Sequence, residues 1–364
     1  MLKSEIRLLV EEMSRRVFLR VGPLRGVPLR LVALVFALTM NRHIPPHLRE
    51  EMRGVARGSD IAYPDLLLLN TLDDVLNILR RLAPRSPHLA CSSFALFGSR
   101  SRDGGLIHGR NLDYHFRGTP LDDGGAVARL LLREATLFVY RPQGRSAFLS
   151  IGWPGLVGTS TAMSLQGLSL GSLTSYLRGN TPNGTPTSIL YRLVMEEASS
   201  LREAGQLLRR SRRTIGNNLV IGSGREKAAA LFEITRDTVE EVLAGDGLLV
   251  ATNHFVSPVL ARRQLPHLLS HSASRLERLQ TLCNRNGVGP EEALTFLADG
   301  EPGGGQGNPF ARVANEGTAV SVLFEPGEMA LWIGRGKEPP ASRGEFLRIE
   351  AGALWARPAG ECET

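Results

Sequence analysis

The sequence predicts an α+β protein in which two antiparallel sheets pack face to face and helices cover their outer faces. Three observations favour this four-layer αββα sandwich. The first ninety residues have the apolar spacing of helices, and short apolar runs separated by turn signals follow them. A central helical block then divides those runs into two groups, as expected when helices lie outside two sheets.

The N-terminal ninety residues are expected to form three helices. The first follows Ser4, a potential N-cap, and its apolar face consists of Ile6, Leu9, Val10, Met13 and Val17. The second begins near Pro46 and ends at Gly58, and the third runs from Pro64 to Leu82. Prolines at positions 84 and 87 end the third helix, so 83–88 is expected to be a linker.

Turn residues pair the strands of the remaining chain into hairpins. The expected pairs are Cys91–Phe97 with Leu106–Leu112, Leu137–Arg141 with Ala147–Ile151, Thr161–Leu165 with Leu168–Leu173, Asn218–Gly222 with Ala229–Thr235, and Thr318–Phe324 with Met329–Gly334. One more strand ends at residues 250–252. Helices are expected over 187–213, with a division at Ser199 and Ser200, and over 273–284 and 290–298. Residues 300–309 are expected to form a glycine-rich loop.

Charge and composition argue against several classes of protein. The net charge is +7, but the first ninety residues carry most of the excess, which does not favour a basic groove for nucleic acid. The three cysteines, Cys91, Cys283 and Cys362, form no CxxC pair, so neither a disulfide framework nor a cysteine-based zinc site is expected. His108 and His254 are isolated, and no nucleotide-binding glycine motif is present, so no metal or cofactor is expected.

The longest apolar run, residues 31–40, bears on location. It is too short to span a bilayer, and it lies too far from Met1 and lacks a cleavage motif for a signal peptide. The sequence therefore predicts a cytoplasmic protein that is not integral to a membrane. A peripheral anchor formed by the arginine-rich N-terminal helices, with residues 31–40 as their apolar face, is an alternative interpretation.

Cys91 is the candidate nucleophile, because it opens the first strand directly after the linker. The expected hairpin brings Arg110 and Asp113 close to it, and a neighbouring arginine is expected to lower the pKa of the thiol. Arg110 and Asp113 are three positions apart, so an uninterrupted strand would point them to opposite faces, and a bulge or strand end is expected between them. The alternatives are a buried structural cysteine and a structural ion pair.

Motifs along the chain resemble the N-terminal-nucleophile cysteine hydrolases. Ala90-Cys91-Ser92-Ser93-Phe94 with His108-Gly109-Arg110-Asn111-Leu112-Asp113-Tyr114 is most similar to the acyl-coenzyme A:isopenicillin N (6-aminopenicillanic acid) acyltransferase branch, and choloylglycine hydrolase and acid ceramidase are more distant relatives. The same order continues in Arg57–Leu66, Ala251-Thr252-Asn253-His254-Phe255, Ser272 with Arg275 and Arg278, and Thr318–Ser321 before Glu325-Pro326-Gly327. Together these motifs cover about residues 45–340.

The resemblance implies the N-terminal-nucleophile fold and a precursor that cleaves itself between Ala90 and Cys91. Residues 1–90 would then be a helical propeptide, retained as a non-covalent subunit or released, and 91–364 the catalytic domain. The new α-amino group of Cys91, with an ordinary pKa of about 7.7–8.0, would serve as the base for its own thiol.

The resemblance also implies roles for other residues. Asp113 would orient the α-amino group, and Arg110 would stabilise the thiolate. Asn253 would donate to the oxyanion, and Arg275 would be an active-site arginine. The alternatives are a turn asparagine for Asn253 and surface charge for Arg275.

The implied reaction is attack on an amide or thioester carbonyl of a small acyl amide or acyl-coenzyme A, through an acyl-enzyme that passes to water or an amine. Ala90 replaces the glycine of the acyltransferase branch. Ser164 and Thr174 lie where the choloylglycine hydrolases have a second oxyanion asparagine, which argues against a bile-salt substrate. An uncleaved binding protein of the same fold is the alternative function.

Overall fold

Two antiparallel sheets form the centre of the molecule. The computed structural model describes residues 2–14, 23–80, 88–115, 125–265, 270–301 and 308–356. The first sheet has the order β10-β1-β2-β11-β12-β13, with bounds Leu248–Ala251, His88–Leu96, Ile107–His115, Thr318–Glu325, Ala330–Arg335 and Glu345–Glu350. The second has the order β3 to β9, with bounds Thr136–Tyr140, Phe148–Gly152, Thr161–Ser164, Leu168–Thr174, Asn217–Ser223, Ala228–Ile234 and Val239–Leu243. Every pairing between neighbouring strands is antiparallel.

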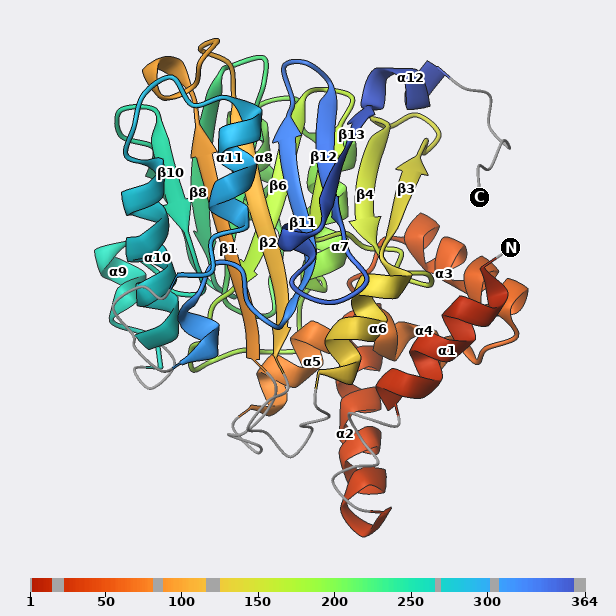
Figure 1. Cartoon of the computed structure of the whole chain (residues 1–364). Coiled ribbons are helices and arrows are strands. Elements are labelled where there is room, and N and C mark those ends of the chain that lie inside the picture. The colour runs from red at the N-terminus through yellow and green to blue at the C-terminus, as the bar shows by residue number, and fades with distance from the viewer. Residues whose placement is uncertain are drawn as a thin grey trace.

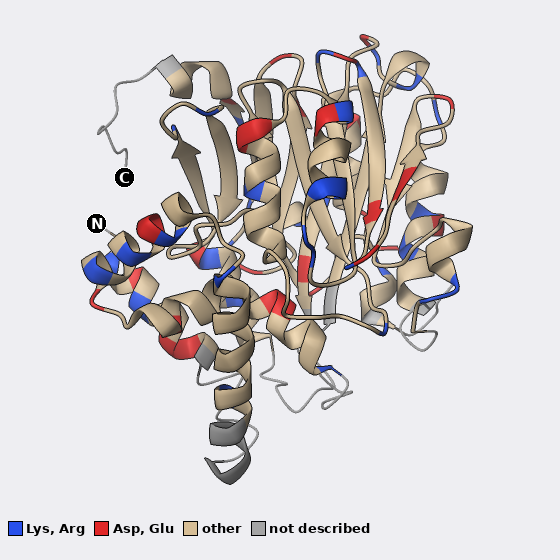
Figure 2. Ribbon diagram, turned by 180° about the vertical axis from the view of Figure 1, so that it is seen from behind, with Lys and Arg blue, Asp and Glu red and all other residues tan. Residues whose placement is uncertain are grey.

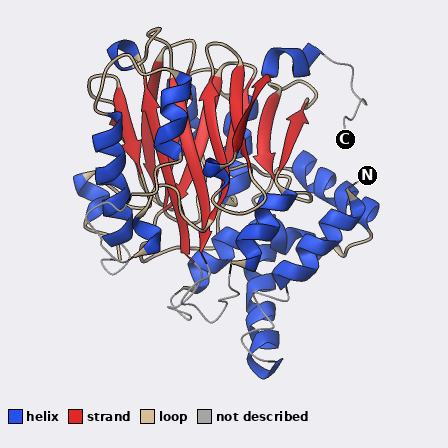
Figure 3. Ribbon diagram, in the orientation of Figure 1, coloured by secondary structure: helices blue, strands red, loops and turns tan. Residues whose placement is uncertain are grey.

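The sheets pack against each other, and helices cover both outer faces (Figures 1 and 3). Helices α10 (Ser270–Cys283) and α11 (Pro290–Leu297) lie on the six-stranded sheet, and α7 (Thr187–Glu197) and α8 (Leu201–Arg210) lie on the seven-stranded sheet. The expected αββα sandwich is therefore confirmed. The division of the central helical block is also confirmed, because Ser200 caps α8 by accepting a hydrogen bond from the backbone N–H of Glu203.

The side chains of β1 alternate between the two faces of the sheet, so this strand packs against both the second sheet and the outer helices. Cys91 belongs to the apolar cluster between the sheets, whereas Phe94 packs on the ring of Phe296 in α11, with 5.9 Å between centroids. Gly109 pairs with Phe94 across the β1–β2 ladder, and a Cβ added at Gly109 would lie 2.4 Å from the Phe94 ring. This position therefore needs glycine for close approach rather than for a turn.

The N-terminal helices pack together at one end of the sandwich (Figure 1). They are α1 (Lys3–Ser14), α2 (Pro23–Asn41), α3 (Pro46–Ser59), α4 (Tyr63–Asn70) and α5 (Leu72–Leu79). The single helix expected over 64–82 is wrong, because Thr71 breaks it into α4 and α5. Just before the break, Asn70 donates to the Leu66 carbonyl within the helix and accepts from the backbone N–H of Val157 outside it.

Several helices and strands were not expected from the sequence. Some residues for which the sequence made a prediction are not among those that the structure describes. Helix α2, the helix α6 (Ala126–Glu134) and the edge strands β9 and β13 are additional. Both edge strands carry exposed charged residues, which obscure the apolar alternation of a strand. Val17, the linker up to residue 87, most of the loop at 300–309, and Cys362 lie outside the described residues. No helix within the described ranges is both long and apolar enough to cross a membrane.

Candidate functional site

Cys91 lies inside β1, and its side chain is buried in the apolar cluster between the sheets, with 1 % of its surface exposed. The peptide bond that joins it to Ala90 is part of a continuous ladder, in which Ala90 pairs with Asp113 and Cys91 pairs with Leu112 of β2. On the other side, β10 pairs with β1 only as far as Ser93 and then ends. The N–H of Cys91 therefore faces the loop that follows β10.

Asn253, in that loop, takes the place of the missing strand. Its Oδ1 accepts hydrogen bonds from the Cys91 backbone N–H at 2.6 Å and from Arg275 Nη2 at 2.6 Å. Its Nδ2 donates to the carbonyl of Thr174, at the end of β6, at 2.9 Å. Both polar atoms of this amide are thus engaged before any cleavage, and one of the two N–H groups on Nδ2 is directed to Thr174.

Arg275 approaches the same peptide from α10. It is fully buried, so the interpretation as surface charge is wrong. Besides Asn253, its Nη2 lies 3.5 Å from the Cys91 carbonyl oxygen, and its Nη1 donates to the Phe310 carbonyl at 2.6 Å. The structure therefore brings Asn253 and Arg275 together at the main-chain atoms of Cys91.

Arg110 and Asp113 flank Cys91 on opposite faces of β2. Arg110 points between the sheets and donates through Nη1 to the Ser172 carbonyl of β6. Asp113 points outward, and its Oδ2 accepts from Asn315 at 2.8 Å. The irregularity expected between them is absent, since β2 pairs with β1 in unbroken register; the register shift lies in the neighbouring strand β11.

The two side chains also retain unused hydrogen-bonding capacity. Arg110 Nε and Nη2 and Asp113 Oδ1 are buried and have no hydrogen-bond partner among the described residues. Burial raises the pKa of Asp113 to about 6, although Arg275, hydrogen bonds from Thr318 and Asn315, and Arg110 oppose the rise. A carboxyl group with such a pKa can exchange protons near neutral pH.

The pKa of the Cys91 thiol differs from the expectation. Burial raises this pKa, and the opposing positive charge of Arg110 does not outweigh it. The expected lowered pKa is therefore wrong for the uncleaved chain. The arginine is near the thiol, but the intact strand and the packed sheets exclude the water that would solvate a thiolate.

Sequence reasoning missed Asn218, which holds the loop of Asn253. Asn218 lies in β7, and its Nδ2 donates to the carbonyls of Thr252 at 2.8 Å and His254 at 2.7 Å, the two residues that flank Asn253. Glu233 of β8 supports the same loop by accepting from the backbone N–H of Ser257 at 3.0 Å. A polar side chain at the start of an otherwise apolar strand was the available signal.

The two histidines are committed to hydrogen bonds. His108 joins Ser93 of β1 at 3.0 Å to Ser169 of β6 at 2.8 Å, and burial with the nearby Arg110 lowers its pKa to about 3. His254 contacts Ser272 at 2.7 Å. Among the described residues, no three His, Cys, Asp or Glu side chains gather in a way that could hold a metal ion.

Helix α5 places two carboxyl groups beside this site. Asp74 accepts hydrogen bonds from the backbone N–H and the hydroxyl of Thr187 at 3.2 and 3.0 Å. Asp73 lines a cavity of about 70 Å³ together with Tyr114 and Trp153. Burial raises the pKa of Asp73 to about 7 and that of Asp74 to about 6; the negative charge of Asp74 also raises the pKa of Asp73, and Arg110 opposes that rise.

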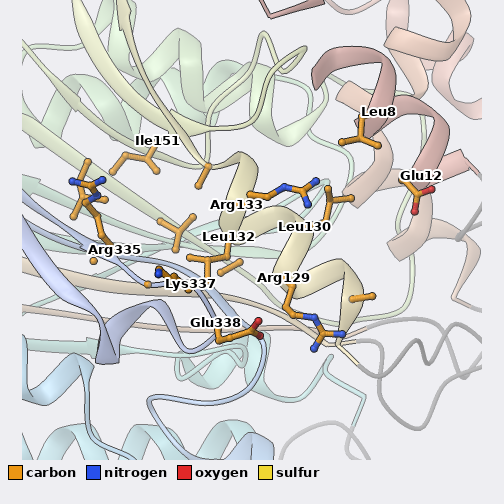
Figure 4. Close-up of a pocket in the computed structure, with 17 residues that line it drawn as sticks. Leu8, Glu12, Arg129, Leu130, Leu132, Arg133, Ile151, Arg335, Lys337 and Glu338 are labelled. Carbon is orange, nitrogen blue, oxygen red and sulfur yellow. The ribbon is translucent and has the colours of Figure 1, made fainter. Parts of the chain in front are cut away.

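A larger groove of about 850 Å³ opens between α1, α6 and the end of β12 (Figure 4). Four basic residues line it together with two acidic ones: Arg129, Arg133, Arg335, Lys337, Glu12 and Glu338. Val320 of β11 also lines it; Val320 pairs with Leu112, and Leu112 pairs with Cys91. This wall of the groove therefore lies two strands away from the strand of the thiol.

A model of the acyl-coenzyme A:6-aminopenicillanic acid acyl-transferase family matches residues 99–338, well over half of the chain. The chain belongs to this family. The match begins after Cys91 and therefore does not include that residue. Family membership supports an enzyme of the amidohydrolase or acyltransferase class.

Other proteins are similar over part of their length. An uncharacterized protein of Archaeoglobus fulgidus is 25 % identical over 60 % of this chain and 40 % of its own length, and protein dcd1B of Dictyostelium discoideum is 25 % identical over 54 % and 35 %. The chain thus spans less than half of either relative. Among solved structures, a Caenorhabditis elegans N-acylethanolamine-hydrolyzing acid amidase ortholog is 18 % identical, over 65 % of this chain and 93 % of that chain, with a TM-score of 0.46.

Proposed function

We propose that this protein is a self-cleaving cysteine amidohydrolase or acyltransferase whose nucleophile is Cys91. The Cys91 sulfur attacks the Ala90 carbonyl carbon, and the thiol proton passes to the Cys91 nitrogen as the C–N bond breaks. Ala90 is then held as a thioester. One water hydrolyses this thioester, which frees the Ala90 carboxylate and leaves Cys91 with a thiol and an α-amino group. The N-terminal-nucleophile fold, with residues 1–90 as propeptide and 91–364 as catalytic domain, belongs to this proposal.

The observation that carries the proposal is the hydrogen bond from the Cys91 N–H to Asn253 Oδ1, which Arg275 supports from the other side. This nitrogen would become the α-amino group, and its acceptor is in place before cleavage. A buried strand peptide ordinarily pairs with another backbone, so a side-chain pair at this one position is a departure that the chemistry explains.

The uncleaved chain needs a different base for the first step, because the α-amino group does not yet exist. Asp113 fits this role, since its Oδ1 is unoccupied and its pKa is raised to about 6. Although its side chain lies on the opposite face of β2 from the thiol, Asp113 is close enough for its backbone to hydrogen-bond the sulfur and for its charge to act on it. Asp113 would receive the thiol proton and pass it to the leaving nitrogen. Arg110, with two guanidinium nitrogens that have no hydrogen-bond partner among the described residues, would stabilise the thiolate that forms.

In the mature enzyme the same groups would act on an external substrate. The α-amino group would take the thiol proton, the sulfur would attack an acyl amide or thioester, and the acyl-enzyme would pass its acyl group to water or an amine. The Nδ2 group of Asn253 has a second N–H that would serve an oxyanion while the first donates to Thr174, whereas its Oδ1 already holds the Cys91 nitrogen. Holding the Cys91 nitrogen is therefore its first role in the proposal.

The basic groove suits the anionic part of an acyl-coenzyme A donor. If it binds those phosphates, Arg335→Ala with Lys337→Ala should raise KM for an acyl-coenzyme A and leave KM for an uncharged N-acyl amide unchanged. Equal effects on both substrates would remove this part of the proposal and leave Cys91 catalysis untouched.

Intact mass spectrometry of the purified full chain tests the central claim. The wild type should yield two fragments, 1–90 and 91–364, whereas Cys91→Ala should stay whole and be inactive. Cys91→Ser is the matched control, because its hydroxyl keeps a weaker nucleophile in the same position and should cut slowly. A wild-type chain that remains whole under native conditions would overturn the proposal.

The depth of the thiol favours a second candidate, an uncleaved binding protein of the same fold. Cys91 is almost completely covered, and burial raises its pKa. This alternative predicts that a thiol reagent fails to label Cys91 at neutral pH in protein left to mature, whereas the enzyme hypothesis predicts labelling that appears together with the fragments.

A further inference from the structure

Helix α2 carries an apolar face that nothing in the described chain covers. Leu31, Val35 and Leu38 are 58 %, 59 % and 48 % exposed and recur at helical spacing along one side. The opposite side, with Ala33, Ala37 and Met40, is fully buried against the other N-terminal helices. The helix is therefore apolar on its outer face as well as on its inner face.

The outer face also offers water few polar groups. No charged residue occurs between positions 31 and 40, and the hydroxyl of Thr39 donates to the Val35 carbonyl within the helix at 2.8 Å. Of ten exposed large apolar side chains in the described part of the chain, four lie on α2, Val32 being the fourth. Contiguous apolar surface of this kind marks an interaction site, whereas single exposed side chains do not.

The position of α2 makes this face accessible. Figure 1 shows α2 extending beyond the sandwich and the other N-terminal helices, and Figure 2 shows its described part almost free of charged residues. The helix has 19 residues, and it does not meet the requirements of a membrane-spanning segment.

The charge of the segment that precedes this face in the sequence favours one kind of partner. Residues 15–30 contain five arginines and no acidic residue, and of these Arg30 is paired with Asp65 of α4. An apolar face that follows an arginine-rich segment in the sequence complements a bilayer with anionic headgroups. Two copies of the chain would instead bring like charges together, and four side chains fall short of the roughly 800 Å² per partner that a stable dimer needs.

We propose that α2 binds the surface of anionic membranes, with Leu31, Val35 and Leu38 entering the boundary between headgroups and acyl chains. The arginines that precede them would contact the headgroups. This role does not depend on Cys91 or on cleavage, so it stands or falls separately from the proposed enzymatic function. It would place the enzyme at a surface where acylated lipids are present.

Vesicle flotation of the full chain tests the proposal, with phosphatidylcholine vesicles that contain or lack phosphatidylserine. The protein should float with the anionic vesicles and be released by high salt. The combined variant Leu31→Ser, Val35→Ser, Leu38→Ser should lose roughly tenfold or more of this partitioning. The matched control is Leu243→Ser with Val259→Ser, which removes exposed apolar side chains elsewhere and should bind as the wild type does.

Three outcomes would overturn the proposal. The wild type could fail to float with anionic vesicles, or the control could lose binding as much as the α2 variant does. The third is a wild-type dimer that the α2 variant converts to a monomer in analytical ultracentrifugation, since a second copy would then cover the face. Thermal unfolding of each variant checks that the fold is intact, and exposed substitutions should leave Tm nearly unchanged.

Discussion

At the scale of single residues, the site depends on side chains that replace missing backbone partners. Asn253 completes the hydrogen bonding of Cys91 where β10 ends, and Asn218 completes that of the loop on which Asn253 lies. A buried carbonyl that loses its donor costs about 1–3 kcal/mol of stability, so such side chains are needed for stability as well as for geometry.

Asn218 is expected to be a positioning residue. Asn218→Ala removes the donors to the carbonyls of Thr252 and His254, so the loop should relax and Asn253 should leave the Cys91 nitrogen. We expect the rate of fragment formation in a time course to fall by more than about tenfold, and the free energy of unfolding by about 1–3 kcal/mol. Asn217→Ala is the control, because the Oδ1 of Asn217 has no partner among the described residues. Equal slowing in both variants would show that Asn218 acts only through stability.

At the scale of elements, α5 places one buried carboxyl group, Asp74, and one partly buried carboxyl group, Asp73, near Arg110 and Tyr114. Asp73 faces Asp74, Arg110 and the Tyr114 ring, and its carboxyl is more easily protonated in the folded chain than in the unfolded one. Its pKa rises from an ordinary 3.8 to about 7. The stability that the proton provides is therefore complete below about pH 4 and is lost as the pH rises through 7.

Asp73→Asn should reveal this dependence, because the amide stays neutral at every pH. The variant should match the wild type near pH 4 and become more stable than it by about 1 kcal/mol or more at pH 8. Urea unfolding of the cleavage-blocked Cys91→Ala chain, with and without Asp73→Asn, measures this difference in the free energy of unfolding. The same histidines titrate in both chains, so their contribution cancels. A difference that stays constant from pH 4 to pH 8 would contradict the raised pKa.

At the scale of the whole molecule, the N-terminal helices are tied to the sandwich by buried polar contacts. Glu51 of α3 accepts two hydrogen bonds at 2.7 Å from the guanidinium of Arg192 in α7, which is 3 % exposed. Asn70 bridges to the loop after β4 at Gly155 and Val157. Contacts of this kind support the proposal that residues 1–90 remain bound after cleavage.

Glu51→Ala should weaken that association. The substitution leaves the buried guanidinium of Arg192 without two of its hydrogen bonds, which typically lowers the free energy of association by a few kcal/mol. In size-exclusion chromatography of cleaved protein, fragment 1–90 should co-elute with 91–364 in the wild type and separate from it in the variant. Glu50→Ala, one position away and exposed, should behave as the wild type does. Retention in both variants would mean that apolar packing alone holds the fragment.

Several parts of this structure could be predicted from the sequence. Hairpin turns such as Gln166-Gly167 and Pro326-Gly327 set strand pairs locally, so the two antiparallel sheets and the helices outside them were predictable. The order of the motifs around Cys91, Asp113 and Asn253 was sufficient to identify the family. These signals are local, because a turn or a short motif specifies its own conformation.

Tertiary structure alone decided the rest. The break at Thr71, the engaged amide of Asn253, the support from Asn218 and the raised pKa of Cys91 all depend on contacts between residues far apart in the chain. The sequence predicted a neighbouring arginine and therefore a lowered thiol pKa, but it does not record how completely two sheets exclude water. Desolvation is a property of the packed molecule, and here it outweighs the nearby charge.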